Sequence, residues 1–181
     1  MRLIARLFSS LTLLTAVGLV LVVLWGPSAP QPPDRPAETA LQGPIDLILI
    51  EKSARRLTLL QNGKQVRSWP MALGFSPIGD KSRQGDGRTP EGLFTINRRN
   101  DASSYHLSLG LDYPHPEDIA VAQAAGYSPG GDIMIHGQPN ALAETQIVPS
   151  DWTAGCIAIT NAQMREIWEH APLGTKVEIR P

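Results

Sequence analysis

The feature that most restricts the fold is a series of short runs rich in Ile, Leu, Val and Thr, separated by Gly, Pro and Asn. Residues 45–51 (IDLILIE) form one such run, and its length is typical of a strand. Asn62-Gly63 separates two more runs and predicts a hairpin, because both residues accept the positive φ of a type I′ turn. Further strands are predicted at 92–99, 105–113, 131–137 and 175–180.

Few helices are expected between these strands. Residues 116–126 favour a short helix with acidic residues in its first turn. Thr160 and Gln163 match a capping box and predict a second helix that reaches about residue 170. Residues 74–92 are dense in Gly, Pro and charge, which predicts a long loop. The sequence therefore predicts a mainly β domain, a β-sandwich or barrel-like sheet with one or two short helices.

An apolar N-terminal segment precedes this predicted domain. Arg2 and Arg6 lie before an uncharged run at 8–25 of about 18 residues, close to the ~20 that a membrane-spanning helix needs. We interpret residues 1–25 as a signal anchor or, alternatively, as a cleaved signal peptide. Either interpretation exports the rest of the chain, because the arginines keep the N-terminus in the cytoplasm. We favour the anchor, since the run is long for a signal peptide and Pro30 follows the candidate cleavage site.

Residues 26–44 contain six prolines and almost no large apolar side chain, which is typical of a semi-extended linker. The folded domain is then expected at 45–181. A formal charge of −1 argues against nucleic acid as a partner, since such binding normally needs a basic face. His106, His115 and His170 show no ligand spacing with one another, so no metal site is expected.

The chain has a single cysteine, Cys156, which has no partner for an intramolecular disulfide. His136 ends an apolar run 20 positions earlier and is followed by Gly137. A thiol becomes a nucleophile when an imidazole takes its proton, and Gly155 and Cys156 carry backbone N–H groups that suit an oxyanion. From spacing alone, the alternative is a packed cysteine and a structural histidine.

These residues resemble the signature of the L,D-transpeptidase catalytic domain, or YkuD, family. In that family His-Gly is followed by Ser/Thr-His-Gly-Cys and a hydrophobic residue, and here sixteen residues separate His136 from Thr153 of Thr153-Ala154-Gly155-Cys156-Ile157. Upstream, Arg83-Gln84-Gly85-Asp86 and Thr89-Pro90-Glu91-Gly92-Leu93-Phe94 are similar to the family's loop and the strand after it. The set is most similar to the YafK-like branch.

The resemblance implies an exported enzyme of the bacterial cell envelope that acts on peptidoglycan stem peptides without a cofactor. Cys156 would be the nucleophile and His136 the general base, with the imidazole oriented by a backbone carbonyl such as that of Gly137. The enzyme would sit on the periplasmic side of the inner membrane, with a secreted form as the alternative. A tetrapeptide stem would form a thioester, which an amine acceptor then attacks.

The same residues are also compatible with other functions. Ala154 stands where the family has a second histidine, and some YafK-like members hydrolyse stem-peptide linkages, including the bond to a wall-attached lipoprotein. The alternatives are therefore an L,D-carboxypeptidase, a lipoprotein-releasing hydrolase, or a catalytically silent wall-binding module.

Five further residues are candidate substrate contacts under this resemblance. Arg83 would bind a stem-peptide carboxylate, although a solvated loop charge is the alternative. Glu91, or Asp86, would recognise an amine of the stem. Trp152 would line the pocket beside the cysteine or pack on the core, and Thr153 would contact substrate from within the motif.

Overall fold

The computed structural model describes residues 40–181. The predicted anchor or signal peptide at 1–25 lies outside these residues, as does most of the predicted linker, so both stay predictions. Within residues 40–181 no helix is long and apolar enough to cross a membrane. The described part includes Leu41, which is buried against the core.

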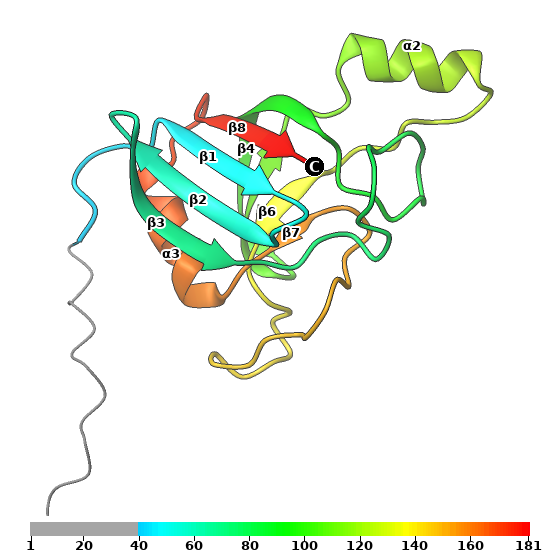
Figure 1. Ribbon diagram of the computed structural model, residues 1–181. Coiled ribbons are helices and arrows are strands. Elements are labelled where there is room, and N and C mark those ends of the chain that lie inside the picture. Colours follow the sequence, from blue (N-terminus) through cyan, green and yellow to red (C-terminus); the bar gives the residue numbers. More distant parts are fainter. Residues whose placement is uncertain (1–39) are drawn as a thin grey trace, which may run out of the picture. The chain divides into compact units, whose positions relative to one another are not determined.

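One eight-stranded sheet forms the body of the domain, in the order β3-β2-β1-β8-β4-β5-β6-β7 (Figure 1). The strands are β1 (Leu47–Glu51), β2 (Arg56–Gln61), β3 (Lys64–Pro70), β4 (Gly92–Ser103), β5 (His106–Leu111), β6 (Met134–His136), β7 (Ile157–Ala158) and β8 (Lys176–Arg180). The helices are α2 (Pro116–Ala124) and α3 (Asn161–His170). The prediction of a mainly β domain with two short helices is confirmed.

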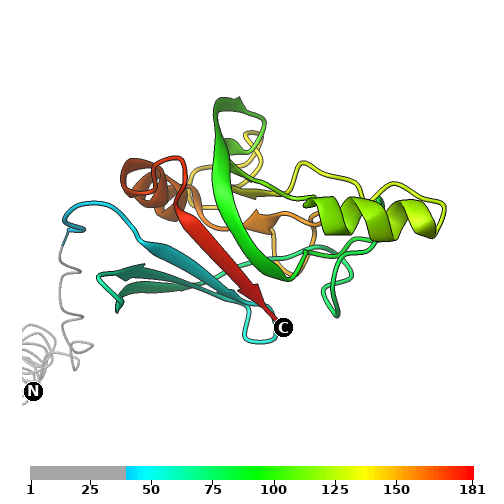
Figure 2. The same ribbon diagram turned by 90° about the horizontal axis from the view of Figure 1, so that it is seen from above.

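The sheet curls because β4 belongs to both of its halves. The first residues of β4 pair antiparallel with β8, and the later ones pair with β5 after an irregularity at Ile96. Figure 2 shows this long strand bending from one part of the sheet to the other. A bulge of this kind increases the local twist and bend of a strand. The curl brings β5, β6 and β7 together in the half that carries the candidate site.

The predicted hairpin joins β2 to β3. Asn62 and Gly63 have φ values of 51° and 70°, as the two central positions of a type I′ turn require. At the other side of β1, β8 pairs in parallel, with Ile48 opposite Val177. Both side chains are fully buried, and each such apolar side chain contributes roughly 1.5–3 kcal/mol to stability.

The two helices differ in how they meet the sheet. α3 begins with the predicted capping box, in which the Thr160 hydroxyl accepts from the Gln163 N–H and the Gln163 side chain accepts from the Thr160 N–H. Its Met164 and Ile167 are buried, and the helix packs on β5 and β6. Only Ala122 of α2 is buried, and this helix lies at the edge of the domain in both views (Figures 1 and 2).

Candidate active site

His136 and Cys156 lie on one face of adjacent strands. His136 is the last residue of β6, and Cys156 immediately precedes β7, which pairs with β6 in parallel. Ile135 faces Ile157 in this register, and both are fully buried in the core. Because side chains alternate along a strand, the imidazole and the thiol both project from the opposite face. The fold thus brings together two residues that are 20 positions apart.

The His136 ring is oriented by its neighbour. Nδ1 lies 2.7 Å from the carbonyl oxygen of Gly137, which can only accept, so Nδ1 carries the proton and Nε2 is free to accept one. Tyr105 and Trp152 pack against the ring, with centroids at 4.7 Å and 5.6 Å. This burial lowers the pKa of His136, and the bond to Gly137 only partly opposes the effect. The imidazole is therefore a neutral base in the resting site.

The thiol rests against the backbone that precedes β6. Cys156 Sγ lies 3.5 Å from the carbonyl oxygen of Asp132, and within residues 40–181 no hydrogen bond joins it to His136. Burial raises the pKa of the Cys156 thiol; a hydrogen bond from the Met134 backbone lowers it, the Asp132 charge raises it, and the Lys81 charge lowers it. The net direction is upward. The resting pair is a neutral thiol and a neutral imidazole, and catalytic hydrogen bonds often tighten only when substrate binds.

Thr153 shapes the turn that presents the cysteine. Its hydroxyl donates to the Cys156 carbonyl at 2.7 Å and accepts from the Gly155 N–H at 3.1 Å. Thr153 is itself buried, so the structure gives it a local role within the motif. The Gly155 N–H, which the sequence suggested for an oxyanion, is directed at this hydroxyl in the structure.

Gly155 and Gly137 each lie where a neighbouring segment comes too close for a side chain. Gly155 has a φ of 138°, and a Cβ there would lie 2.6 Å from the Arg88 carbonyl oxygen. A Cβ on Gly137 would lie 2.6 Å from Asn161 Oδ1. Both glycines therefore let neighbouring segments of the protein pack against the two catalytic candidates.

The remaining predicted substrate contacts lie at different distances from the catalytic candidates. Trp152 packs against His136, and its buried Nε1 has no hydrogen-bond partner among the described residues 40–181. Arg83 lies over the Tyr127 ring, with 5.8 Å between the guanidinium carbon and the ring centroid. Glu91 is 2.7 Å from the ammonium of Lys52. Of these three, only Trp152 contacts the histidine.

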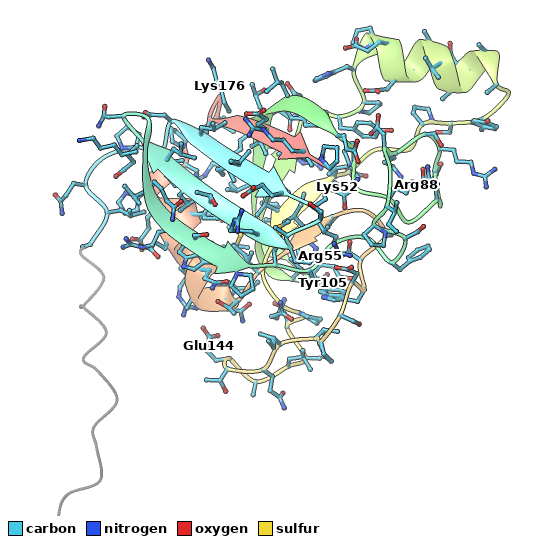
Figure 3. The ribbon with its side chains drawn as sticks, in the orientation of Figure 1. Lys52, Arg55, Arg88, Tyr105, Glu144 and Lys176 are labelled. Atoms are coloured by element: carbon cyan, nitrogen blue, oxygen red, sulfur yellow. The ribbon has the colours of Figure 1, made fainter. Side chains whose placement is uncertain are left out.

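Two ion pairs fix the loop between β3 and β4, residues 71–91. Lys52, just after β1, reaches this loop to pair with Glu91, and Figure 3 shows Lys52 near Arg88 of the same loop. Lys81 pairs with Asp86 at 2.8 Å, and both side chains are buried. The two carboxylates that the sequence offered for amine recognition therefore each hold a lysine of the chain itself. Residues 40–181 contain no group of three or more His, Cys, Asp or Glu side chains that could hold a metal ion.

Sequence reasoning missed Tyr105 and Lys81. Tyr105 lies in the turn between β4 and β5, and its ring covers His136, while its own backbone carbonyl accepts from the Gly137 N–H. The sequence predicted Tyr105 as the first residue of a strand and gave no signal of this contact, because the contact depends on how β5 and β6 pair. Lys81 lies in a charged loop, where burial of its side chain is unexpected.

A cavity of about 390 Å³ lies beside the two catalytic candidates and not over them. Its walls come from the end of β3, residues 147–151 and Ala158, and the Arg55–Asp151 ion pair lies at its edge. Figure 3 shows Arg55 at the end of the sheet. Neither His136 nor Cys156 lines this space, so it is a neighbouring cavity and the thiol must be reached from another side.

Comparison with known sequences gives one family. The family model of YkuD, the L,D-transpeptidase catalytic domain, matches residues 45–179. An Escherichia coli protein named "Putative L,D-transpeptidase YafK" is 28% identical over 153 residues, which cover 81% of this chain and 55% of that protein. The chain thus spans about half the length of the curated relatives it matches.

Comparison with solved structures agrees on the fold. The helical cell shape determining protein Pgp2 of Campylobacter jejuni aligns with a TM-score of 0.59 at 24% identity, over 77% of this chain and 48% of that one. An L,D-transpeptidase of Xylanimonas cellulosilytica aligns with a TM-score of 0.53 at 19% identity, over 77% and 62% of the two chains. These structures share the curled sheet on which His136 and Cys156 are placed.

Proposed function

Because the chain belongs to the YkuD family of L,D-transpeptidase catalytic domains, we propose that it is a cysteine acyltransferase that acts on peptidoglycan stem peptides. The observation that carries this proposal is the 2.7 Å bond from His136 Nδ1 to the Gly137 carbonyl. It leaves Nε2 as a free base on the face that also carries Cys156. A positioned base of this kind is what activates a thiol that is protonated at rest.

In the proposed reaction, Cys156 Sγ attacks the carbonyl between the third and fourth residues of a tetrapeptide stem. The thiol proton passes to His136 Nε2, and the C–N bond breaks as that proton moves to the departing terminal D-amino acid. A thioester remains. The amine of a second stem then attacks it, loses a proton to His136 and forms a 3→3 cross-link, and Cys156 regains its proton. Splitting the acyl transfer through a covalent intermediate lowers the barrier of each step.

A second candidate is hydrolysis of the same thioester, either of a stem peptide or of a linkage to a wall-attached lipoprotein. The observation that favours it is Ala154, whose exposed side chain stands where the family motif has a histidine. Without that imidazole, the rim of the site has one fewer group to hold an amine acceptor. Water would then release a tripeptide.

The location proposed for this activity is the periplasmic side of the inner membrane. It is supported by Arg2, Arg6 and the uncharged run at 8–25, which together have the pattern of a signal anchor. A mature N-terminus located after Ala29, found by mass spectrometry of the protein from cells, would instead indicate a cleaved and secreted form.

The activity is tested by incubating the full chain with tetrapeptide muropeptides and analysing the products by mass spectrometry. A 3→3 dimer supports the transpeptidase, and a tripeptide alone supports the hydrolase. Cys156→Ala and His136→Ala should each abolish turnover. If the wild-type chain forms neither product and a carbapenem adds no mass to Cys156, the enzyme proposal is wrong, and binding of wall fragments by Cys156→Ala would point to the silent module.

A further inference from the structure

Lys81 of the loop and Lys52, which reaches the loop, are almost fully buried. They differ in how many of their ammonium N–H groups donate hydrogen bonds. The side chains of Lys52 and Lys81 are each 3% exposed. A buried ammonium has three N–H donors to satisfy. Lys52 uses all three, on the carbonyls of Gly79 and Thr89 and on Glu91, at 2.7–2.9 Å. Lys52 is thus a complete structural bridge.

Lys81 uses only two donors. Its ammonium is 2.8 Å from Asp86 Oδ1 and 3.1 Å from the Arg83 carbonyl oxygen, and no third acceptor lies within hydrogen-bonding distance among residues 40–181. A desolvated cation with an unused donor is costly in a purely structural position. The comparison with Lys52 indicates that the charge of Lys81 has another use.

The position of Lys81 connects it to the cysteine. Its Cε would lie 3.5 Å from a Cβ built on Gly130, two residues before Asp132, whose carbonyl oxygen faces Cys156 Sγ at 3.5 Å. The same loop is fixed on the other side of the cysteine, where the Phe75 N–H donates to the Thr153 carbonyl. The loop therefore brings the Lys81 side chain to the segment, residues 130–132, whose backbone contacts the thiol.

Asp86 holds this cation in place. Its carboxylate accepts from Lys81 and from the backbone N–H groups of Ser82, Arg83 and Arg88. Burial alone would raise the pKa of Asp86, but these four donors lower it to about 2. The carboxylate therefore stays ionised at any physiological pH.

The charges near the thiol can be weighed by their exposure. The imidazole of His136 is neutral, which leaves Asp132 opposing the thiolate and Lys81 favouring it. The Asp132 side chain is 83% exposed and paired with Arg98 at 2.8 Å, so water and the guanidinium screen it. Lys81 is in low dielectric, where a charge acts more strongly over the same distance. Lys81 is the cation that favours ionisation of the thiol, and it acts against the Asp132 charge.

We propose that the Lys81 ammonium stabilises the negative charge on Cys156 Sγ while the thiol proton passes to Nε2 of His136. Lys81 neither takes nor gives a proton in this step, so it is a positioning residue. The proton that leaves the sulfur makes the imidazole positive, and the thiolate is left negative within the field of the fixed Lys81 cation. This inference rests on the acyl-transfer function proposed above, because it concerns the same nucleophile.

The test is the pH dependence of alkylation of Cys156 by iodoacetamide in the full chain, followed by intact mass. The chain has one cysteine, so the signal reports that thiol alone. Lys81→Met should move the titration midpoint up by about one pH unit, so that alkylation below the midpoint is about tenfold slower. Lys52→Met is the matched control: it removes an equally buried lysine and should leave the midpoint unchanged.

The result that overturns the proposal is an unchanged midpoint in Lys81→Met, or an equal shift in both variants. If near-ultraviolet circular dichroism shows that Lys81→Met does not fold, Lys81→Gln replaces it, because the amide still donates to Asp86 but carries no charge. The same shift is expected there. Alkylation needs no peptidoglycan, so a shift without turnover on muropeptides would reject the enzyme proposal alone, and turnover without a shift would reject the role of Lys81 alone.

Discussion

Asp86 allows a quantitative prediction about the loop that carries Lys81. Its pKa is depressed from the ordinary 3.8 to about 2, which corresponds to about 2.4 kcal/mol of stability. A depressed folded-state pKa gives stability that is fully present above pH 3.8 and is lost as the pH falls through the folded value. By this linkage, Asp86 loses about 1.1 kcal/mol of its contribution between pH 7 and pH 3. Asp86→Asn cannot lose it, because the amide does not titrate.

The measurement is urea denaturation of wild type and Asp86→Asn at pH 7, 5, 4 and 3, followed by tryptophan fluorescence. Other carboxylates titrate in both proteins and cancel in the difference between the two unfolding free energies. That difference should favour wild type at pH 7 and shrink by about 1.1 kcal/mol at pH 3. Asp86→Asn loses both the ion pair with Lys81 and hydrogen bonds, so it should also unfold at a lower urea concentration than wild type at every pH.

The control is Glu51→Gln, which removes a carboxylate paired with Arg56 on the exposed side of the sheet. Exposed pairs contribute little and are screened by salt, so any pH-dependent difference in this variant should vanish at high ionic strength. The buried Asp86 difference should persist in salt. A wild-type advantage over Asp86→Asn that stays constant from pH 7 to pH 3 would refute the assignment of a strongly stabilised carboxylate.

Three further predictions follow from the site. Because burial raises the pKa of Cys156 and lowers that of His136, alkylation of the thiol should accelerate steadily above pH 7; a rate that is flat from pH 5 to pH 8 would instead indicate a preformed thiolate. Gly155→Ala combines a φ of 138° with a Cβ 2.6 Å from a backbone oxygen, so its free energy of unfolding in urea should fall by about 2–4 kcal/mol. Gly63→Ala, whose Cβ would have nothing within 4 Å, should lose only about 1 kcal/mol. Similar losses in the two variants would contradict the close approach. Trp152→Phe removes an N–H that has no partner among residues 40–181, so the free energy of unfolding should fall only by the cost of the smaller ring, about 1–2 kcal/mol; a loss well above that range would contradict an unbonded N–H.

The elements that the sequence predicted well depend on local chemistry. Asn62-Gly63 sets its own turn, and the Thr160 capping box needs only residues within one turn of helix, so each could be recognised without the rest of the fold. The strand β7 was not predicted, because two residues, Ile157 and Ala158, show no alternation. The curl of the sheet was equally hidden, since it comes from β4 exchanging partners at Ile96.

The same contrast between local sequence patterns and long-range contacts applies to the candidate site. His136 and Cys156 could be proposed from the sequence because the motif around them is ordered along the chain. The surroundings of the pair were not found, because they come from contacts between distant residues. Glu91 was offered for a substrate amine, but it meets Lys52 from 39 positions away. Sequence shows that a charge is present and does not show which partner the fold gives it.

The position of β8 in the sheet also affects how the domain is made. This strand follows β1–β7 along the chain, lies between β1 and β4, and so joins the β1–β3 half to the half that carries His136 and Cys156. Pairing Ile48 with Val177 closes a loop of well over 100 residues, and such non-local contacts form slowly. Until β8 is available, β1 and β4 each expose an unpaired edge to which other chains can bind. The half of the sheet that carries His136 and Cys156 is therefore joined to β1–β3 only once β8 has paired with both β1 and β4.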